Sequence, residues 1–383
     1  ESIGAKLEGW DYPMHFLLGD FPLAWDRPSD QAYYYAFEET FFVIVPVSAG
    51  YWRVVVKRDG PFDPAAKIEA NDIRELAERY LPTGLLAGDP IWLSGAPFYM
   101  RMASSLQRGR RFLCGDAAHL FSPIGGTGMN TGMMDAFDLA WRLAYVHHGH
   151  STAEAVLPSY GEERSEAIER GAAAADAATR LIARIERAPE RIAPMLPSLR
   201  GRRLLRRVFP FQQAGLGLEY SRSSIIRGGN AAGAPRPGTM CLGLLELRRQ
   251  IEVRTGKRTP LLETSVLIFV AAESLSAREV KLRAWLSDLS RFGGASLGVH
   301  IIAIGRKLPA RSSATLAIDD ITTLRRLGAR DGAVLAIRPD GIIAFSGGLD
   351  DRQALLEHLG RWLVSASAEV TAQVPMVASN ASG

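Results

Sequence analysis

The first hundred residues show the alternation of apolar and polar positions, and the aromatic and β-branched composition, that are typical of β-strands. Runs of this kind lie at residues 33–35, 41–45 and 52–56, and proline or glycine residues separate them. Helical spacing then replaces alternation between Asn71 and Tyr80, where Ile73 and Ala77 share one face and Asn71 can cap the first turn. The pattern predicts an antiparallel sheet with a short helix packed against it.

The middle of the chain changes from strands to long helices. Strand-like sequence continues at Ile91–Met102 and Arg111–Cys114, and we expect Cys114 to be buried in the second of these strands. A glycine-rich loop follows, and helical spacing resumes over Asn130–His148 and again over Ser159–Ala188. The sequence therefore predicts two long helices after the loop.

A proline- and glycine-rich segment at residues 228–238 indicates a domain boundary. Beyond it, apolar strand-like runs alternate with amphipathic helical stretches; the runs lie at residues 266–270, 300–304 and 334–337, and the helical stretches at 277–292 and 351–363. This order predicts a small α/β domain. We place the predicted domains at residues 1–100, 101–225 and 226–364, and we expect the tail at 365–383, which has no periodicity, to be disordered.

The composition excludes several classes of protein. With 47% hydrophobic and 22% charged residues among 383, the chain has the composition of a globular protein. Its 45 basic and 41 acidic residues nearly balance, so nucleic acid is not an expected partner. No run of about 18 apolar residues occurs, so we expect no membrane span. Cys114 and Cys241 have neither CxxC nor zinc-ligand spacing, which predicts no metal site and favours a reducing, cytoplasmic location.

The clearest chemical signal lies between the last predicted strand of the first half and the long helix. Residues 115–143 read GDAAHLFSPIGGTGMNTGMMDAFDLAWRL. A strand delivers the carboxylate of Asp116, glycines allow backbone N–H groups to approach a ligand, and the N-terminus of a helix favours a negative charge. A glycine loop before a helix is by itself a weak signal, compatible with phosphate binding or with a tight turn alone.

The complete ordered string is more specific. It resembles the flavin motif of the group A aromatic hydroxylases, the family of p-hydroxybenzoate hydroxylase and phenol hydroxylase. The likeness extends upstream to Trp92–Arg111 and downstream to Ser159–Arg164, and the residues from Arg338 to Gly341 resemble a strand of the thioredoxin-like domain of the phenol hydroxylase branch. The resemblance implies a mixed α+β and α/β fold. Its parts would be the remainder of a p-hydroxybenzoate hydroxylase-like FAD fold, with an antiparallel substrate sheet and flavin-side helices, and a thioredoxin-like α/β domain.

The resemblance also implies an activity and the residues that serve it. Such enzymes are FAD-dependent monooxygenases that take electrons from NADPH or NADH and use O2 to hydroxylate a phenolic or polycyclic aromatic substrate. The implied cofactor-binding residues are Asp116 for the ribityl chain and, for the flavin edge, Gly126, Gly128, Met129 and Asn130. Backbone donors near Met129 and Asn130 would stabilise the anionic edge of a reduced flavin. Pro123 is the expected catalytic residue, shaping the pocket in which oxygen reacts.

Substrate contacts are expected from the sheet of the first hundred residues. The aromatic candidates are Tyr35, Phe42, Trp52, Trp92 and Phe98. For any single one of them, a place in the hydrophobic core is the more frequent outcome. His119 directly follows the Asp116 motif, and we expect it to brace the loop rather than to transfer protons.

One departure from the family affects the expected activity. Family members begin with a βαβ unit that carries G-x-G-x-x-G for the pyrophosphate, and this sequence contains no such motif. We therefore expect a fragment that lacks the ADP-binding βαβ unit. The alternative is a non-catalytic remnant, or one half of a split flavoprotein that does not bind FAD alone.

Two further interpretations concern related chemistry. Flavin-dependent epoxidases, halogenases and reductases share this kind of motif, but the W-x-W signature of halogenases is absent. The C-terminal domain lacks the CxxC of a redox-active thioredoxin. We expect it to serve in packing or in a homodimer contact.

Overall fold

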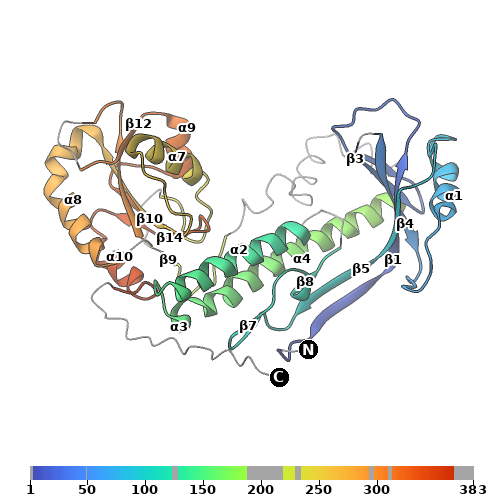
Figure 1. The fold of residues 1–383 in the computed structure, drawn as a ribbon, viewed down its shortest axis with the longest axis horizontal. Coiled ribbons are helices and arrows are strands. Elements are labelled where there is room, and N and C mark those ends of the chain that lie inside the picture. Colours follow the sequence, from blue (N-terminus) through green and yellow to red (C-terminus); the bar gives the residue numbers. More distant parts are fainter. Residues whose placement is uncertain are drawn as a thin grey trace, which may run out of the picture. The chain divides into compact units, whose positions relative to one another are not determined.

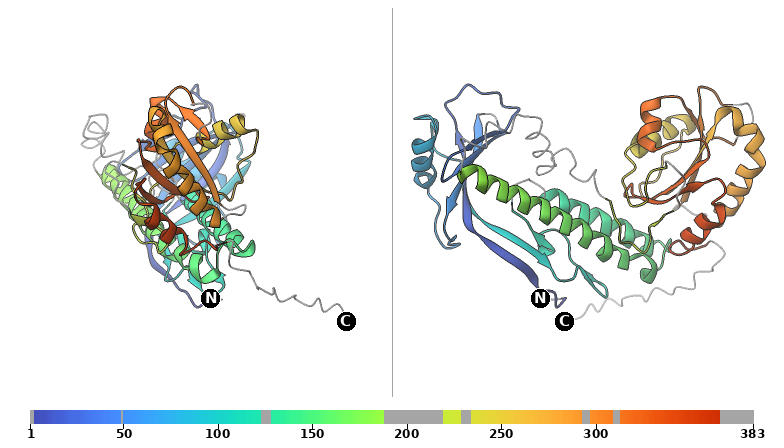
Figure 2. Two further views of the ribbon diagram at one scale, coloured as in Figure 1. Left: turned by 90° about the vertical axis from the view of Figure 1, so that its left-hand side faces the viewer. Right: turned by 180° about the vertical axis from the view of Figure 1, so that it is seen from behind.

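The computed structural model describes residues 3–48, 50–122, 128–187, 219–228, 234–292, 297–308 and 313–365 (Figures 1 and 2). The chain divides into two compact units. The first contains Glu1–Asp135 and Ala167–Gly215, and the second contains Ala136–Glu166 and Leu216–Gly383. The predicted domain limits stay a prediction.

A six-stranded sheet forms the centre of the first unit. Its order is β2 (Tyr33–Ala36), β3 (Phe41–Ser48), β4 (Tyr51–Asp59), β1 (Leu7–Pro22), β5 (Trp92–Ala103) and β8 (His119–Leu120). All neighbouring strands are antiparallel, which confirms the predicted antiparallel sheet. Residues 111–114 form less of a strand than expected: β7 covers Arg111–Phe112 and pairs with the equally short β6 (Gln107–Arg108). Cys114 lies beyond β7 and is exposed, so the expectation that it is buried in a strand was wrong.

Two helices cover opposite faces of this sheet. Side chains alternate between the faces of a strand, so the neighbours Phe41 and Phe42 belong to different cores. Phe42 packs in the cluster that includes Ile73 of α1 (Ala70–Tyr80). Phe41 packs in the cluster that includes Ala178 of α4 (Pro158–Arg187). Both faces are therefore apolar where a helix covers them.

The start of α1 differs from the sequence prediction. The N-cap is Glu69, whose backbone N–H donates to the Asp72 carboxylate at 2.8 Å, and Asn71 is not the cap. An acidic residue in the first turn satisfies a free N–H group and complements the positive end of the helix dipole. The helix itself lies where the periodicity predicted it.

A second six-stranded sheet forms the core of the second unit. Its order is β12 (Leu316–Ile318), β11 (Leu297–Ile304), β10 (Thr264–Ala271), β13 (Ala333–Ile337), β14 (Ile343–Gly348) and β9 (Arg227–Gly228). Strands β10, β11 and β12 run parallel, whereas β13 is antiparallel to β10 and to β14. The crossover from β10 to β11 contains α8 (Leu275–Leu289), as a parallel connection requires. The predicted small α/β domain is therefore present.

The other helices of the second unit complete its layers. Helices α7 (Leu244–Thr255) and α9 (Ile321–Leu327) pack on one face of the sheet, in a cluster that includes Leu247, Phe269 and Leu327. Helices α8 and α10 (Arg352–Leu359) lie on the other face (Figure 1). Among the helices that the structure describes, none has the length and apolar character needed to cross a bilayer.

Two long helices contribute residues to both units. Helix α2 (Gly128–His147) begins in the first unit, and the short helix α3 (Ala153–Val156) connects it to α4. The predicted helix starts at Asn130 and Ser159 were therefore right to within two residues. Thr152 caps α3 by accepting from the N–H of Ala155.

Candidate functional site

The Gly-Asp sequence of the motif forms a tight turn in the first unit. Residues Gly115–Ala117 make a single 3-10 turn, and Gly115 has a φ of +59°, a conformation that side chains other than glycine rarely adopt. The turn leaves Asp116 exposed. Its carboxylate is thus available to accept hydrogen bonds from a ligand.

A buried carboxylate on α2 holds this turn in place. Asp135 accepts a hydrogen bond from the N–H of Gly115 at 3.0 Å, and its Oδ2 lies 2.8 Å from Nε2 of His119. Both His119 and Asp135 are buried, and the His119 ring stacks on Phe121 at a centroid distance of 4.6 Å. His119 therefore braces the turn and strand β8 against helix α2, as its position after the motif led us to expect.

Gly132 in α2 permits the turn to approach the helix closely. A Cβ atom at this position would lie 3.1 Å from the Cα of Gly115, which is closer than ordinary contact. Glycine inside a helix costs about 1 kcal/mol relative to alanine, so its presence in α2 calls for a packing reason of this kind. Gly132 was not among the predicted site residues, although the cost of a glycine inside a helix is a signal that the sequence contains.

Helix α4 holds the residues that lead into the loop. The hydroxyl of Thr179 lies 2.8 Å from that of Ser122 and donates to the Ala175 carbonyl. The ring of Phe121 packs where Gly171 of α4 has no side chain. Pro123 and Gly126, the expected catalytic residue and one expected flavin-edge residue, lie outside the described residues.

The first turn of α2 is open. Met129 is 74% exposed, and among the residues that the structure describes no atom would lie within 4 Å of a Cβ placed on Gly128. No acidic residue occurs in this first turn, so the turn itself places no carboxylate beside its N–H groups. Gly128, Met129 and Asn130 therefore lie together at a helix N-terminus that suits a negatively charged group.

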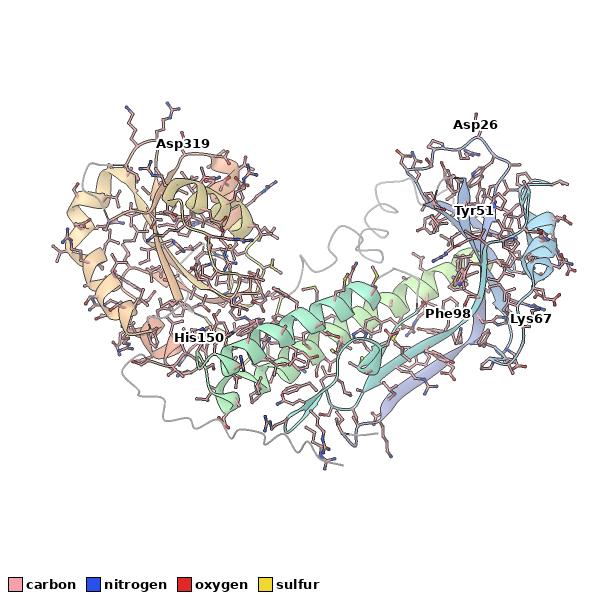
Figure 3. The ribbon with its side chains drawn as sticks, in the orientation of Figure 1. Asp26, Tyr51, Lys67, Phe98, His150 and Asp319 are labelled. Carbon is pink, nitrogen blue, oxygen red and sulfur yellow. The ribbon has the colours of Figure 1, made fainter. Side chains whose placement is uncertain are left out.

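The five aromatic substrate candidates do not share one face of the sheet. Phe42 and Trp52 are buried in the core between the sheet and α1, and Tyr35 packs against the same core. Phe98 is fully buried on the opposite face, against Phe16 and Ala178 (Figure 3). Phe42, Trp52 and Phe98 are therefore core residues, which is the more frequent outcome expected for each candidate.

Trp92 differs from the other candidates. Its side chain is 41% exposed, and the Arg53 guanidinium lies 4.5 Å from the centre of its ring. Arg53 also makes a bidentate ion pair with Asp20, at 2.8 and 2.9 Å. Asp20 faces both Trp92 and Arg53 in the strand register, so the three residues form one row across the sheet.

The next row on the α4-facing side of the sheet continues from Ser94, which pairs with Leu18, into aliphatic residues. It contains Leu18, Val43 and Val55, which are half-buried and belong to the cluster around Phe98. None of these three aliphatic residues was among the predicted substrate contacts, which were all aromatic. The register of the strands is the signal that identifies this row.

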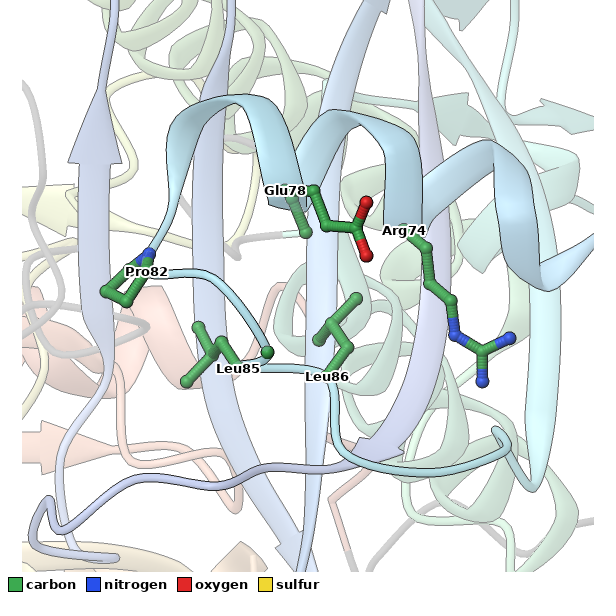
Figure 4. Close-up of a pocket in the computed structure, with 7 residues that line it drawn as sticks. Arg74, Glu78, Pro82, Leu85 and Leu86 are labelled. Carbon is green, nitrogen blue, oxygen red and sulfur yellow. The ribbon is translucent and has the colours of Figure 1, made fainter.

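The cavity in Figure 4 lies away from the motif. It is a small, partly open hollow between α1 and the loop that follows it. The lining residues are Arg74, Ala77, Glu78, Pro82, Gly84, Leu85 and Leu86. None of them is a predicted site residue, so we assign no ligand to this cavity.

Comparison with known proteins agrees with the fold and the motif. Residues 2–175 match the family described as FAD binding domain. The chain is 32% identical over 174 residues to pentachlorophenol 4-monooxygenase of Sphingobium chlorophenolicum, an alignment that covers 43% of this chain and 31% of that protein. It is 33% identical over 248 residues to 6-methylpretetramide 4-monooxygenase of Streptomyces rimosus, covering 62% of this chain and 44% of that protein. The chain thus spans less than half the length of these two relatives.

A solved structure supports the same conclusion about the fold. The flavin-dependent monooxygenase PieE, in complex with FAD and substrate, is similar with a TM-score of 0.65 and 17% identity, over 94% of this chain and 67% of that one. At this identity the likeness shows the fold alone. The predicted fold class, that of the FAD-dependent aromatic hydroxylases, is confirmed.

Proposed function

We propose that the chain, whose residues 2–175 match the FAD binding domain family, provides the flavin-ring side and the substrate side of an FAD-dependent aromatic monooxygenase. The proposal rests chiefly on the turn and helix start described above, where exposed Asp116 and the open first turn of α2 belong to one braced substructure. NADPH or NADH would supply the electrons, and O2 the oxygen atom. A phenolic or polycyclic aromatic compound would be the substrate.

The residues present fit a flavin. The Asp116 carboxylate suits the ribityl chain, because it can accept a hydrogen bond from a hydroxyl. The N–H groups of Met129 and Asn130 suit the pyrimidine edge of the ring, since this edge gains negative charge on reduction. When bound, FAD supplies the hydride acceptance and oxygen activation that side chains lack. Gly126 and Pro123 would complete the loop.

The α4-facing side of the first sheet is the proposed substrate face. Its row of Leu18, Val43 and Val55 offers apolar contact to an aromatic ring. Trp92 and Arg53 lie beside that row and offer a ring face and a cation. Of the five aromatic candidates, we propose only Trp92 for direct contact with the substrate. Phe98 is buried and packs in the core of this side of the sheet.

Flavin titration tests the proposal. We expect the chain to change the fluorescence of added riboflavin, which carries both the ring and the ribityl chain. Asp116→Ala should weaken binding about 10- to 100-fold, because a hydrogen bond to a charged group contributes about 1.5–3 kcal/mol. Asp26→Ala, which removes an equally exposed carboxylate far along the chain, should leave it unchanged. An affinity that is the same in both variants would contradict the proposed site.

The alternative is a non-catalytic remnant, or one half of a split flavoprotein that does not bind FAD alone. Comparing the affinity of the chain for FAD with its affinity for riboflavin distinguishes this alternative from a chain that binds the whole cofactor. Equal affinities mean that this chain does not hold the adenosine part. Oxidation of NADH or NADPH that accelerates when an aromatic substrate is added would support the catalytic proposal.

For the second unit we propose a thioredoxin-like packing domain. The order β10, α8, β11, then the hairpin β13–β14 and α10, supports this assignment. Burial raises the pKa of the Cys241 thiol to about 11, so it stays protonated at neutral pH. Cys114, the other cysteine, belongs to the first unit. A packing or homodimer role therefore suits this domain better than thiol chemistry, and a cytoplasmic location suits the two free thiols.

A further inference from the structure

Five buried charged side chains form a cluster in the second unit, which we call the ion network. Asp138 and Arg142 come from α2, Glu163 from α4, and Arg338 and Asp340 from the turn between β13 and β14. The side chains of Arg142, Glu163 and Arg338 have no exposed surface. The ion network thus joins three elements that are distant in the sequence.

Glu163 is the centre of the ion network. Its two oxygens accept from both terminal nitrogens of Arg338, at 2.5 and 2.8 Å, in a bidentate pair. One of them also accepts from Arg142 at 2.8 Å. Arg142 continues to Asp138 at 2.7 Å, and Arg338 to Asp340 at 2.5 Å. Bidentate pairs of this kind fix orientation as well as distance.

The turn that carries Arg338 is itself rigid. Gly341 has a φ of +84°, and its N–H donates to the Arg338 carbonyl at 2.9 Å. The Asp340 carboxylate accepts from the N–H of Ile342. The guanidinium carbons of Arg142 and Arg338 lie 4.5 and 5.3 Å from the ring centre of Trp141 on α2. The arginine therefore meets the helices from a fixed position.

Stability alone explains the ion network poorly. Replacing buried ion pairs by apolar residues is often neutral or stabilising, because desolvation offsets the attraction. Here three carboxylates face two guanidiniums, which leaves one surplus negative charge. Oδ2 of Asp138 has no hydrogen-bond partner among the described residues, and burial raises the pKa of this carboxyl to about 6. Because the ion network carries these energetic costs, its role is better explained by the way it fixes the elements that it joins.

We propose that Arg338 and Glu163 are positioning residues for helix α2, fixing its rotation and its register and so directing its first turn. Asp138 and Arg142 are four residues apart and share one face of the helix. They lie about 15 and 21 Å along the axis from Gly128, at 1.5 Å per residue. Helix α2 is continuous over its 20 residues, so what holds this segment also sets the direction of its start. The consequence for a flavin rests on the proposed function.

Hydrogen exchange of the full chain without flavin tests the proposal. Arg338→Met should accelerate exchange of the α2 amides from Gly132 to Asp135 at least ten-fold, while the amides of β1 and β4 stay as in the wild type. The matched control is Arg278→Met, because Arg278 makes a bidentate pair of similar length with Asp331 in the same unit, on the surface. The control should leave the α2 amides unchanged.

The other outcomes decide the matter as well. If Arg338→Met accelerates exchange in β13 and β14 but not in α2, the proposal is wrong and the ion network only stabilises the second sheet. Should Arg338→Met fail to fold, Arg338→Lys replaces it, since lysine keeps the charge but loses the bidentate fork. It should show the same local effect in α2, and unchanged α2 exchange in this variant also refutes the proposal. A failure of riboflavin binding would leave these exchange results intact, so the two proposals can fail separately.

Discussion

The two ends of helix α2 differ in almost every physical property. At its start, Met129 is largely exposed, and no atom of the described part of the chain would contact a Cβ placed on Gly128. Toward its end, Trp141, Arg142 and Tyr145 are buried, and Arg142 belongs to the ion network. A ligand site needs unsatisfied donors, and a precise site needs a rigid support. On the proposed function, the first turn of α2 would provide the donors, and the ion network holds the other end of the helix.

The anchored end should tolerate substitution least. Glu163→Ala removes the acceptor that Arg142 and Arg338 share and leaves two buried cations short of a partner. We expect a loss of about 3–5 kcal/mol in the free energy of unfolding, measured by urea denaturation.

Glu279→Ala is the matched control for this loss. Glu279 pairs with Arg283 one helical turn away and also accepts a hydrogen bond from the Ser313 hydroxyl at 2.9 Å, so its removal should cost about 1–2 kcal/mol. If both variants lose the same small amount of stability, the contrast between the two ends of α2 does not hold.

The pH dependence of stability tests the same comparison, because burial shifts the pKa values of His358 and Asp138, which lie near the buried end of α2. Burial, with smaller contributions from Arg361, Arg227 and Arg338, lowers the pKa of His358 to about 4. Its stabilising contribution is thus complete above its unfolded pKa of about 6.5 and is lost as the pH falls toward 4. His358→Phe should remove this loss, so that between pH 6.5 and 4 the variant gains up to about 3 kcal/mol relative to the wild type.

Asp138 should respond with the opposite sign. Its pKa is raised to about 6, so its ionised form is the costly one and the protein gains stability as the pH falls through 6 toward 3.8. Asp138→Asn should remove that gain. Urea denaturation at a series of pH values measures both effects. Parallel pH curves for wild type and both variants would show that neither group titrates as its burial implies.

Near the start of α2, the size of the side chain at position 132 should decide both stability and riboflavin binding. Gly132→Ala places a Cβ atom 3.1 Å from the Cα of Gly115, so we expect the turn to move, at a cost of about 1–3 kcal/mol, with weaker riboflavin binding. Gly161→Ala in α4 meets no atom of the described residues within 4 Å and should instead stabilise the protein by up to about 1 kcal/mol. Equal effects of the two substitutions on thermal unfolding and on riboflavin affinity would mean that the turn is not packed against the helix.

Local sequence patterns predicted most elements of this fold, because periodicity reports which positions are buried within one element. The assignment of aromatic residues to faces was less successful. The first sheet is covered on both sides, so Phe41 and Phe42 are equally apolar and only the register with α1 and α4 separates them. The cap of α1 was misplaced by two residues because an acidic side chain took the place of an asparagine.

The contacts that define the candidate site were beyond local patterns. The motif correctly marked the turn at Asp116 and the start of α2, since their residues lie close together in the sequence. By contrast, Gly132 packs on Gly115 from a different element, and Arg338 meets Glu163 across 175 residues. Contacts between residues so far apart in the sequence depend on the tertiary fold, so local patterns in a single sequence do not reveal them.

Amide chemical shifts of the chain during a riboflavin titration test the central claim most directly. If the first turn of α2 holds the flavin edge, the amides of Gly128, Met129 and Asn130 shift most, together with those beside Asp116, and Asp116→Ala reduces the shifts at a given riboflavin concentration. If these amides stay in place while others shift, or if nothing shifts at millimolar riboflavin, the first turn of α2 is not a flavin site.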